Sequence, residues 1–246
     1  MLFRPKNSIL VSFDYEGPES FADLDDQISA IEEHYRFCKL SELVQSKKMG
    51  RAFLVFENPR KGTLLKGIPA LVSRELSFTL FVDPDYVGLN RLPLMEEFVA
   101  YQKSYPEKWT PSEQLKWMER AVQDPSEVDT FLKKCRGDLG PLPIDQLDPL
   151  SFFSTWGKLI EWPVHLVEFG LSLRHNISAE SLRRKIEFFE WQLKVRPVVA
   201  RLVKEKVSAQ EIELLERAGI RILVGHQKGE ITEDTSPWDV PIWSLV

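Results

Sequence analysis

The sequence has few of the residues that build disulfide frameworks and zinc sites, with 2 cysteines and 4 histidines among its 246 residues. Cys38 and Cys135 lie far apart and share no CxxC spacing, which indicates neither a disulfide framework nor a thiolate zinc site. Because free cysteine is among the most frequently buried residue types, we expect two reduced, buried thiols.

Long apolar runs and basic tracts are also missing from the sequence. The apolar stretch before Asp14 is only a few residues long, far short of a signal-peptide core or of the about 20 apolar residues of a membrane span. The net charge is -5, and no basic run offers the positive surface that nucleic acid requires. We therefore expect a cytoplasmic protein with no stable membrane insertion and no nucleic-acid partner.

The hydrophobic content of 43% is enough for a substantial core, and we expect one domain over residues 1–246. Short β-rich runs alternate with longer stretches of helical period, a pattern typical of a mostly parallel sheet wrapped by helices. The predicted strands are residues 8–13, 51–56, 76–82, 171–173 and 220–224, and residues 197–202 fit either a strand or a helix.

Helix starts are marked by capping residues. Ser20 with Asp23 precedes apolar residues at helical spacing, and Ser178 precedes another such series. Thr110 with Glu113 and Ser208 with Glu211 form capping-box patterns. We expect helices after each of these starts, including one over residues 115–122.

The order of these segments resembles the polysaccharide deacetylase (NodB-homology) family over most of the chain. Residues 51–88, RAFLVFENPRKGTLLKGIPALVSRELSFTLFVDPDYVG, are similar to the family's core unit, in which a strand ends in Thr-Phe-Asp-Asp-Gly and a second strand reads Thr-Phe-Phe-Val. Residues 162–185 resemble the family's histidine segment and its following helix. The resemblance implies an α/β fold, a distorted (β/α) barrel of the polysaccharide deacetylase type with fewer than eight strands.

The resemblance also implies functional positions. In the family one Asp is the general base, and a second Asp with two His binds a divalent metal. These positions carry Glu57 as the base and Asn58 with His175 as metal ligands, while the second His falls at or near Ala179. Because zinc prefers three good protein ligands, we expect a degenerate site that binds zinc weakly.

The first motif has a second placement, at residues 12–18, where Asp14 and Glu16 resemble the two acidic positions with one residue interposed. Both placements follow predicted strands, and the carboxyl ends of barrel strands meet at one edge. We expect catalytic Asp14 and Glu57 at this edge, together with a set of saccharide-binding residues. This substrate set is Glu16, Asp83, Arg174, Trp162 and Trp238, the two tryptophans serving as stacking platforms.

Three functions are compatible with this pattern. The first is a carbohydrate deacetylase, a hydrolase of non-peptide carbon–nitrogen bonds, acting on a saccharide or sugar-linked carrier in surface polysaccharide or O-antigen biosynthesis. The second is an inactive carbohydrate-binding or scaffold protein on the same fold. The third is a metal-independent enzyme with Glu57 or Asp14 as base. A fold does not decide between them, and the sequence does not specify the oligomeric state.

Overall fold

The structure is a computed structural model of the 246-residue chain. It describes residues 7–14, 16–17, 19–46, 48–89, 91–92, 94–110, 112–113, 115–117, 119, 125–143, 147–174, 177–203 and 207–243. Among these residues no helix is long and apolar enough to cross a membrane.

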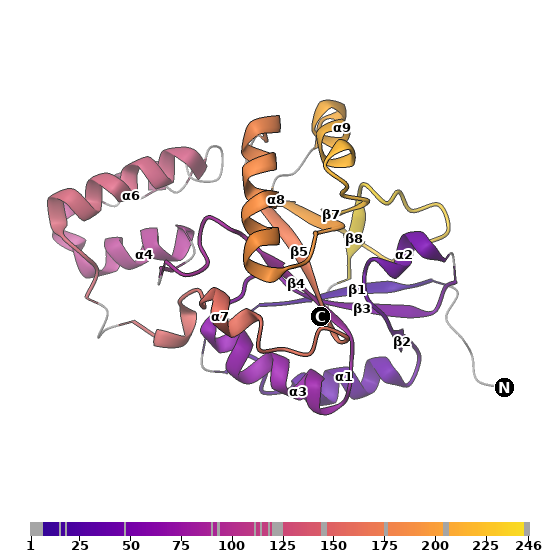
Figure 1. Cartoon of the computed structure of the whole chain (residues 1–246). Coiled ribbons are helices and arrows are strands. Elements are labelled where there is room, and N and C mark those ends of the chain that lie inside the picture. Colours follow the sequence, from indigo (N-terminus) through magenta and orange to yellow (C-terminus); the bar gives the residue numbers. More distant parts are fainter. Residues whose placement is uncertain are drawn as a thin grey trace.

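The strands form one curled, all-parallel sheet with helices packed outside it (Figure 1). Its path runs β1-β3-β4-β5-β6-β7-β8, and the two-residue β2 pairs only with β3. The strands are β1 (Ile9–Phe13), β2 (Arg36–Phe37), β3 (Arg51–Phe56), β4 (Phe78–Val82), β5 (Val167–Arg174), β6 (Val199–Val203), β7 (Ile222–Lys228) and β8 (Val240–Ile242). A single parallel bridge between Val11 and Trp243 links the two ends of this path.

The expected distorted (β/α) barrel is confirmed. The continuous path has seven strands, and counting β2 gives eight among the described residues. The expectation of fewer than eight strands therefore holds for the path but not for the whole sheet. The ambiguous segment 197–202 contributes strand β6.

The helices lie outside the sheet or in a lobe at one side of it. They are α1 (Leu24–Glu32), α2 (Glu42–Gln45), α3 (Ile68–Ser73), α4 (Leu94–Ser104), α6 (Pro125–Leu139), α7 (Trp156–Leu159), α8 (Ala179–Leu193) and α9 (Ala209–Arg217). A π-helical turn, Thr63–Gly67, leads into α3. Two predicted caps are present, since Ser178 accepts from the Ser181 backbone and Ser208 with Glu211 completes a capping box. The expected start at Ser20 and Asp23 differs, because Asp23 precedes α1 but makes no side-chain capping hydrogen bond.

Helices α4 and α6 form a lobe that projects from the sheet (Figure 1), which we call the α4–α6 lobe. Its core contains Phe98, Tyr101, Phe131, Leu132 and Cys135. The sequence patterns used above do not identify α4 or α6. Of the helix expected over residues 115–122, the described positions 115–117 and 119 are helical, and the rest lie outside the described residues.

Strand β3 shows how the sheet divides the core. Its residues are all buried, and they alternate between two clusters, as side chains of a strand must. Leu54 and Phe56 join the cluster that includes helix residues such as Ile28, whereas Phe53 and Val55 join a cluster drawn from six of the strands. These strands are far apart along the path, so their side chains can meet only in the interior that the curled sheet encloses.

Gly170 of β5 also lies at this interior. A Cβ atom at this position would come within 2.6 Å of the Phe81 ring and 2.9 Å of Val199. Glycine is therefore required for the close packing of Phe81 across β5.

Candidate functional site

We call the end of the sheet at which its parallel strands stop the carboxyl edge. Side chains that point into the curl can be followed along each strand to this edge. The alternation that turns Phe53 and Val55 inward also directs Glu57 inward, and the same holds for Asp83 after Phe81 and Arg201 after Val199. Polar side chains from different strands thus meet at one edge, as parallel topology dictates.

Asp14 and Asn58 lie together at the carboxyl edge because β1 and β3 are neighbours in register, with Phe13 opposite Phe56. The Asn58 Nδ2 donates a hydrogen bond to the Asp14 Oδ2 over 2.9 Å. The two sequence placements of the first family motif therefore converge on a single cluster.

Glu57 is held by partners from two other strands. The Ser12 Oγ of β1 donates to the Glu57 Oε1 over 2.6 Å, and Arg201 of β6 forms an ion pair with the same oxygen. The side chain of Glu57 remains 27% exposed, whereas that of Arg201 is 9% exposed. A carboxylate fixed in this way is oriented and still open to solvent.

The Arg201 guanidinium is desolvated by the interior of the sheet. Burial lowers the pKa of Arg201 to about 10, and the nearby Asp14 carboxylate acts in the opposite direction. Its buried Nε has no hydrogen-bond acceptor among the described residues. A side chain whose pKa is perturbed so strongly by burial is more common at functional sites than elsewhere.

Arg60 is a second buried cation at the carboxyl edge. Its Nη2 lies 3.0 Å from the Asp14 Oδ2, and its guanidinium also contacts both carboxylate oxygens of Glu96, at 2.9 and 2.7 Å. Burial raises the pKa of Glu96, while Arg60 opposes that shift. Arg60, Glu96 and Arg201 were not identified from the sequence, although a charged residue within the apolar run of β6 is an available signal.

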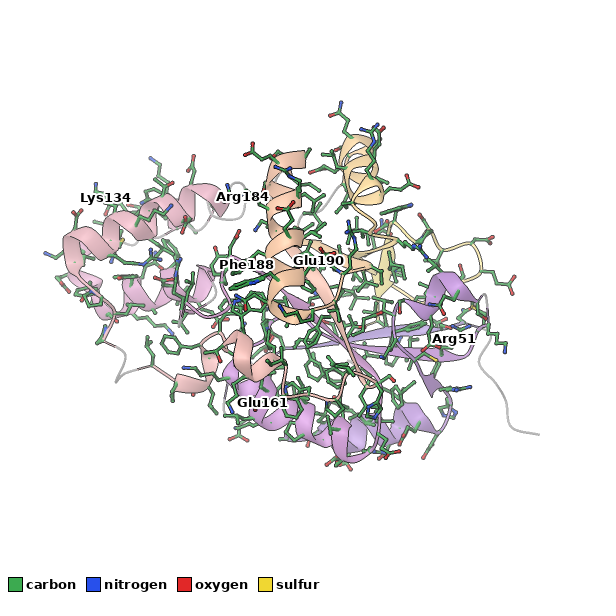
Figure 2. All side chains as sticks on the ribbon, in the orientation of Figure 1. Arg51, Lys134, Glu161, Arg184, Phe188 and Glu190 are labelled. Carbon is green, nitrogen blue, oxygen red and sulfur yellow. The ribbon has the colours of Figure 1, made fainter. Side chains whose placement is uncertain are left out.

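Asp83 follows β4 and is 2% exposed. Its Oδ1 accepts a hydrogen bond from the Asp85 backbone N–H and lies 3.7 Å from the Lys185 Nζ, and Lys185 also forms an ion pair with Asp85. A cavity of about 480 Å³ adjoins this group, lined by Pro84, Asp85, Ser181, Arg184, Lys185 and Phe188. Figure 2 shows Arg184 and Phe188 along α8.

Other expected site residues are less closely tied to this cluster. Glu16 is exposed, its backbone N–H donates to Ser20, and its carboxylate is near enough to Glu96 to help raise the pKa of that residue. Arg174 ends β5 at the carboxyl edge, but its side chain lies outside the described part of the structure. His175 lies outside it entirely.

The two tryptophans expected as stacking platforms lie away from the carboxyl edge. Trp162 precedes β5, and Trp238 precedes β8 beside the start of β7, where the Pro237 carbonyl accepts from the Leu223 N–H. Both therefore lie toward the amino-terminal ends of their strands, and both pack against the outer core. The presence of a tryptophan in the sequence does not indicate whether its ring lies at the amino end or the carboxyl end of the sheet.

The described residues do not fit the divalent metal implied by the family resemblance. Asn58 directs an N–H donor toward Asp14, whose Oδ2 also contacts the Arg60 cation, whereas a metal requires lone pairs. Ala179, the first residue of α8, offers no donor atom. Within the described ranges, no group of three or more His, Cys, Asp or Glu side chains is placed to hold a metal.

Comparison with known proteins gives a match in structure but not in sequence. No protein-family model matches the sequence, and no curated protein matches it significantly. IcaB from Ammonifex degensii is similar with a TM-score of 0.62 and 12% identity, over 98% of this chain and 93% of that chain. The BpsB deacetylase domain from Bordetella bronchiseptica has a TM-score of 0.59 and 13% identity, over 96% and 94% of the two chains.

The deacetylase PplD from Streptococcus pyogenes, solved in complex with acetate, has a TM-score of 0.59 and 11% identity, over 96% of this chain and 90% of that chain. At such low identities the similarity concerns the fold. The chain thus has the fold of the polysaccharide deacetylases over nearly its whole length, as the sequence resemblance implied.

Proposed function

We propose that this chain is a polysaccharide deacetylase-like protein that binds an N-acetylated saccharide at its carboxyl edge without a divalent metal. The proposal rests on one observation: the side chains at the motif positions are already engaged in contacts within the protein. Asn58 donates a hydrogen bond to Asp14, and Asp14 also contacts Arg60. Arginine side chains thereby balance the negative charges of Asp14 and Glu57 at the carboxyl edge. The edge still has polar groups suited to a hydroxyl-rich ligand.

The cavity beside Asp83 supports a saccharide as the ligand. Lys185, Arg184 and Asp85 supply hydrogen-bonding groups, and the 40% exposed Phe188 supplies an aromatic ring. Such a combination of a few oriented polar groups and an aromatic surface is typical of small-molecule sites. We place the saccharide, free or on a sugar-linked carrier, in surface polysaccharide or O-antigen biosynthesis as part of this proposal.

One observation favours a second candidate, metal-independent deacetylation. Both contacts of Glu57 reach its Oε1, so the Oε2 is the oxygen that would take a proton from an attacking water. The water oxygen would form the new bond to the acetyl carbon, the carbon–nitrogen bond would break, and the proton would pass to the leaving amine. General-base help of this kind is typically worth about 10²- to 10⁴-fold in rate.

The test is a binding titration with oligomers of N-acetylglucosamine, followed by an acetate-release assay on the same samples. We expect binding that weakens at least tenfold in Phe188→Ala. The matched control is Val164→Ala, which removes an apolar side chain that is 77% exposed and precedes β5. Loss of binding in the control variant but not in Phe188→Ala would contradict the proposed site.

The acetate assay separates the two candidates. The binding function predicts no release with or without zinc. Metal-independent release that disappears in Glu57→Gln would establish the second candidate instead.

A further inference from the structure

Arg60 lies in a backbone segment that is fixed on both sides. The Lys61 N–H donates to the Phe152 carbonyl over 2.9 Å, and the Ser154 N–H donates to the Pro59 carbonyl over 2.8 Å. The segment that returns from the α4–α6 lobe therefore pairs with the turn after β3 and covers it. Arg60 is 5% exposed under this cover, so its guanidinium is positioned before any ligand arrives.

The guanidinium joins two acidic side chains from different parts of the fold. Asp14 follows β1, and Glu96 lies in the first turn of α4. The contact with Glu96 uses both Nη atoms and both carboxylate oxygens, a fork geometry that arginine provides and that lysine cannot reproduce.

The two groups seen to contact the Asp14 Oδ2 are both hydrogen-bond donors. The Asp14 Oδ2 accepts from both Asn58 and Arg60. A metal ion in contact with this oxygen would face the Asn58 N–H and the positive charge of Arg60, and both repel it. The same atoms thus stabilise the guanidinium and exclude a divalent ion.

We propose that Arg60 is a built-in cation, which supplies the positive charge that a divalent ion would otherwise supply between Asp14 and Glu96. Its side chain also ties the carboxyl edge to the α4–α6 lobe through Glu96. The inference does not depend on saccharide binding, because it concerns the charge balance of the unliganded protein.

Three predictions distinguish this role from an ordinary ion pair. The melting temperature of the unaltered protein changes by less than about 1 °C between EDTA and 1 mM Mn²⁺, our probe because carboxylate and amide oxygens suit it. Arg60→Ala melts about 5 °C lower, because it leaves the partly exposed Asp14 and Glu96 carboxylates without their shared cation. In Arg60→Ala, Mn²⁺ restores at least half of the lost melting temperature and binds at least tenfold more tightly than to the unaltered protein.

Arg91→Ala is the matched control. Arg91 pairs with Glu97 of α4 at 3.0 Å and lies 3.7 Å from Asp129 of α6, and Glu97 keeps Arg136 as a partner, so removal of Arg91 should lower stability without creating Mn²⁺ affinity. If Arg60→Ala does not fold, Arg60→Lys keeps the charge without the fork, and it should fold with an intermediate melting temperature and no response to Mn²⁺.

Two results would overturn the proposal. The first is a rise of several degrees in the melting temperature of the unaltered protein with Mn²⁺. The second is a folded Arg60→Ala that gains no Mn²⁺ affinity beyond the Arg91→Ala control. Neither result bears on sugar affinity, which is measured separately.

Discussion

Arg201 of β6 forms an ion pair with Glu57 after β3, although β4 and β5 separate their strands along the sheet. Only the curl of the sheet brings them into contact, so the pair connects opposite sides of the carboxyl edge. Because the Arg201 side chain is 9% exposed, this connection lies largely away from solvent.

The first prediction concerns the energy of this pair. Arg201→Met should lower the free energy of unfolding by about 2–3 kcal/mol, since it leaves Glu57 without its cation but partly hydrated. Glu57→Gln should cost a similar amount, because it leaves the buried Arg201 without its ion-pair partner. In chemical denaturation, the double variant should lose at least about 1 kcal/mol less unfolding free energy than the two single variants lose together.

The control for this cycle is Arg217→Ala, which removes an exposed i,i+4 partner of Glu213. Its effect should stay below about 0.5 kcal/mol. Strict additivity of the Glu57 and Arg201 changes would show that the pair is not coupled in solution.

The second prediction concerns pH. Burial raises the pKa of Glu96 above its ordinary value of 4.5, so the native state holds this proton at a pH where the unfolded state has lost it. The contribution of Glu96 to stability is therefore complete below the unfolded pKa and is lost as the pH rises through the folded pKa.

The measurement is the free energy of unfolding from pH 4.5 upward in the unaltered protein and in Glu96→Gln. The difference between the two should decline as the pH rises through the folded-state pKa of Glu96. A difference that instead grows with pH would mean that Arg60 lowers the pKa of Glu96 more than burial raises it.

The third prediction concerns the thiols. Both cysteines are buried, as expected from the sequence. Burial raises the pKa of Cys135 to about 11 and also raises that of Cys38. Since the thiolate is the reactive form, a disulfide reagent such as DTNB should react slowly with the native protein and rapidly with two thiols after unfolding. A fast native phase would place one thiol at the surface.

The fourth prediction tests packing inside the curl. Gly170→Ala would place a methyl group 2.6 Å from the Phe81 ring, and overpacking of this kind costs about 1–3 kcal/mol. Gly157→Ala is the matched control, because a Cβ at that position in α7 meets nothing within 4 Å. Equal stability of the two variants would contradict the described interior.

Strands β1, β3, β4, β5 and β7 and the nearness of Asp14 to Asn58 could be predicted from the sequence, because apolar runs locate strands and parallel topology brings their ends together. The short β2 and β8 were not predicted. The Arg201–Glu57 pair could not be predicted, since it depends on how tightly the sheet curls. The Arg60–Glu96 contact depends on α4, which the sequence patterns did not identify. Trp162 and Trp238 lie away from the carboxyl edge, and the residue type of a ring does not indicate the end of the sheet at which it lies.

The central claim is a saccharide site that works without metal, and its most direct test is calorimetric titration of N-acetylglucosamine oligomers into EDTA-treated protein, repeated with zinc. We expect the same affinity in both titrations and a loss of at least tenfold in Phe188→Ala. Binding that appears only with zinc, or no binding in either titration, would contradict it.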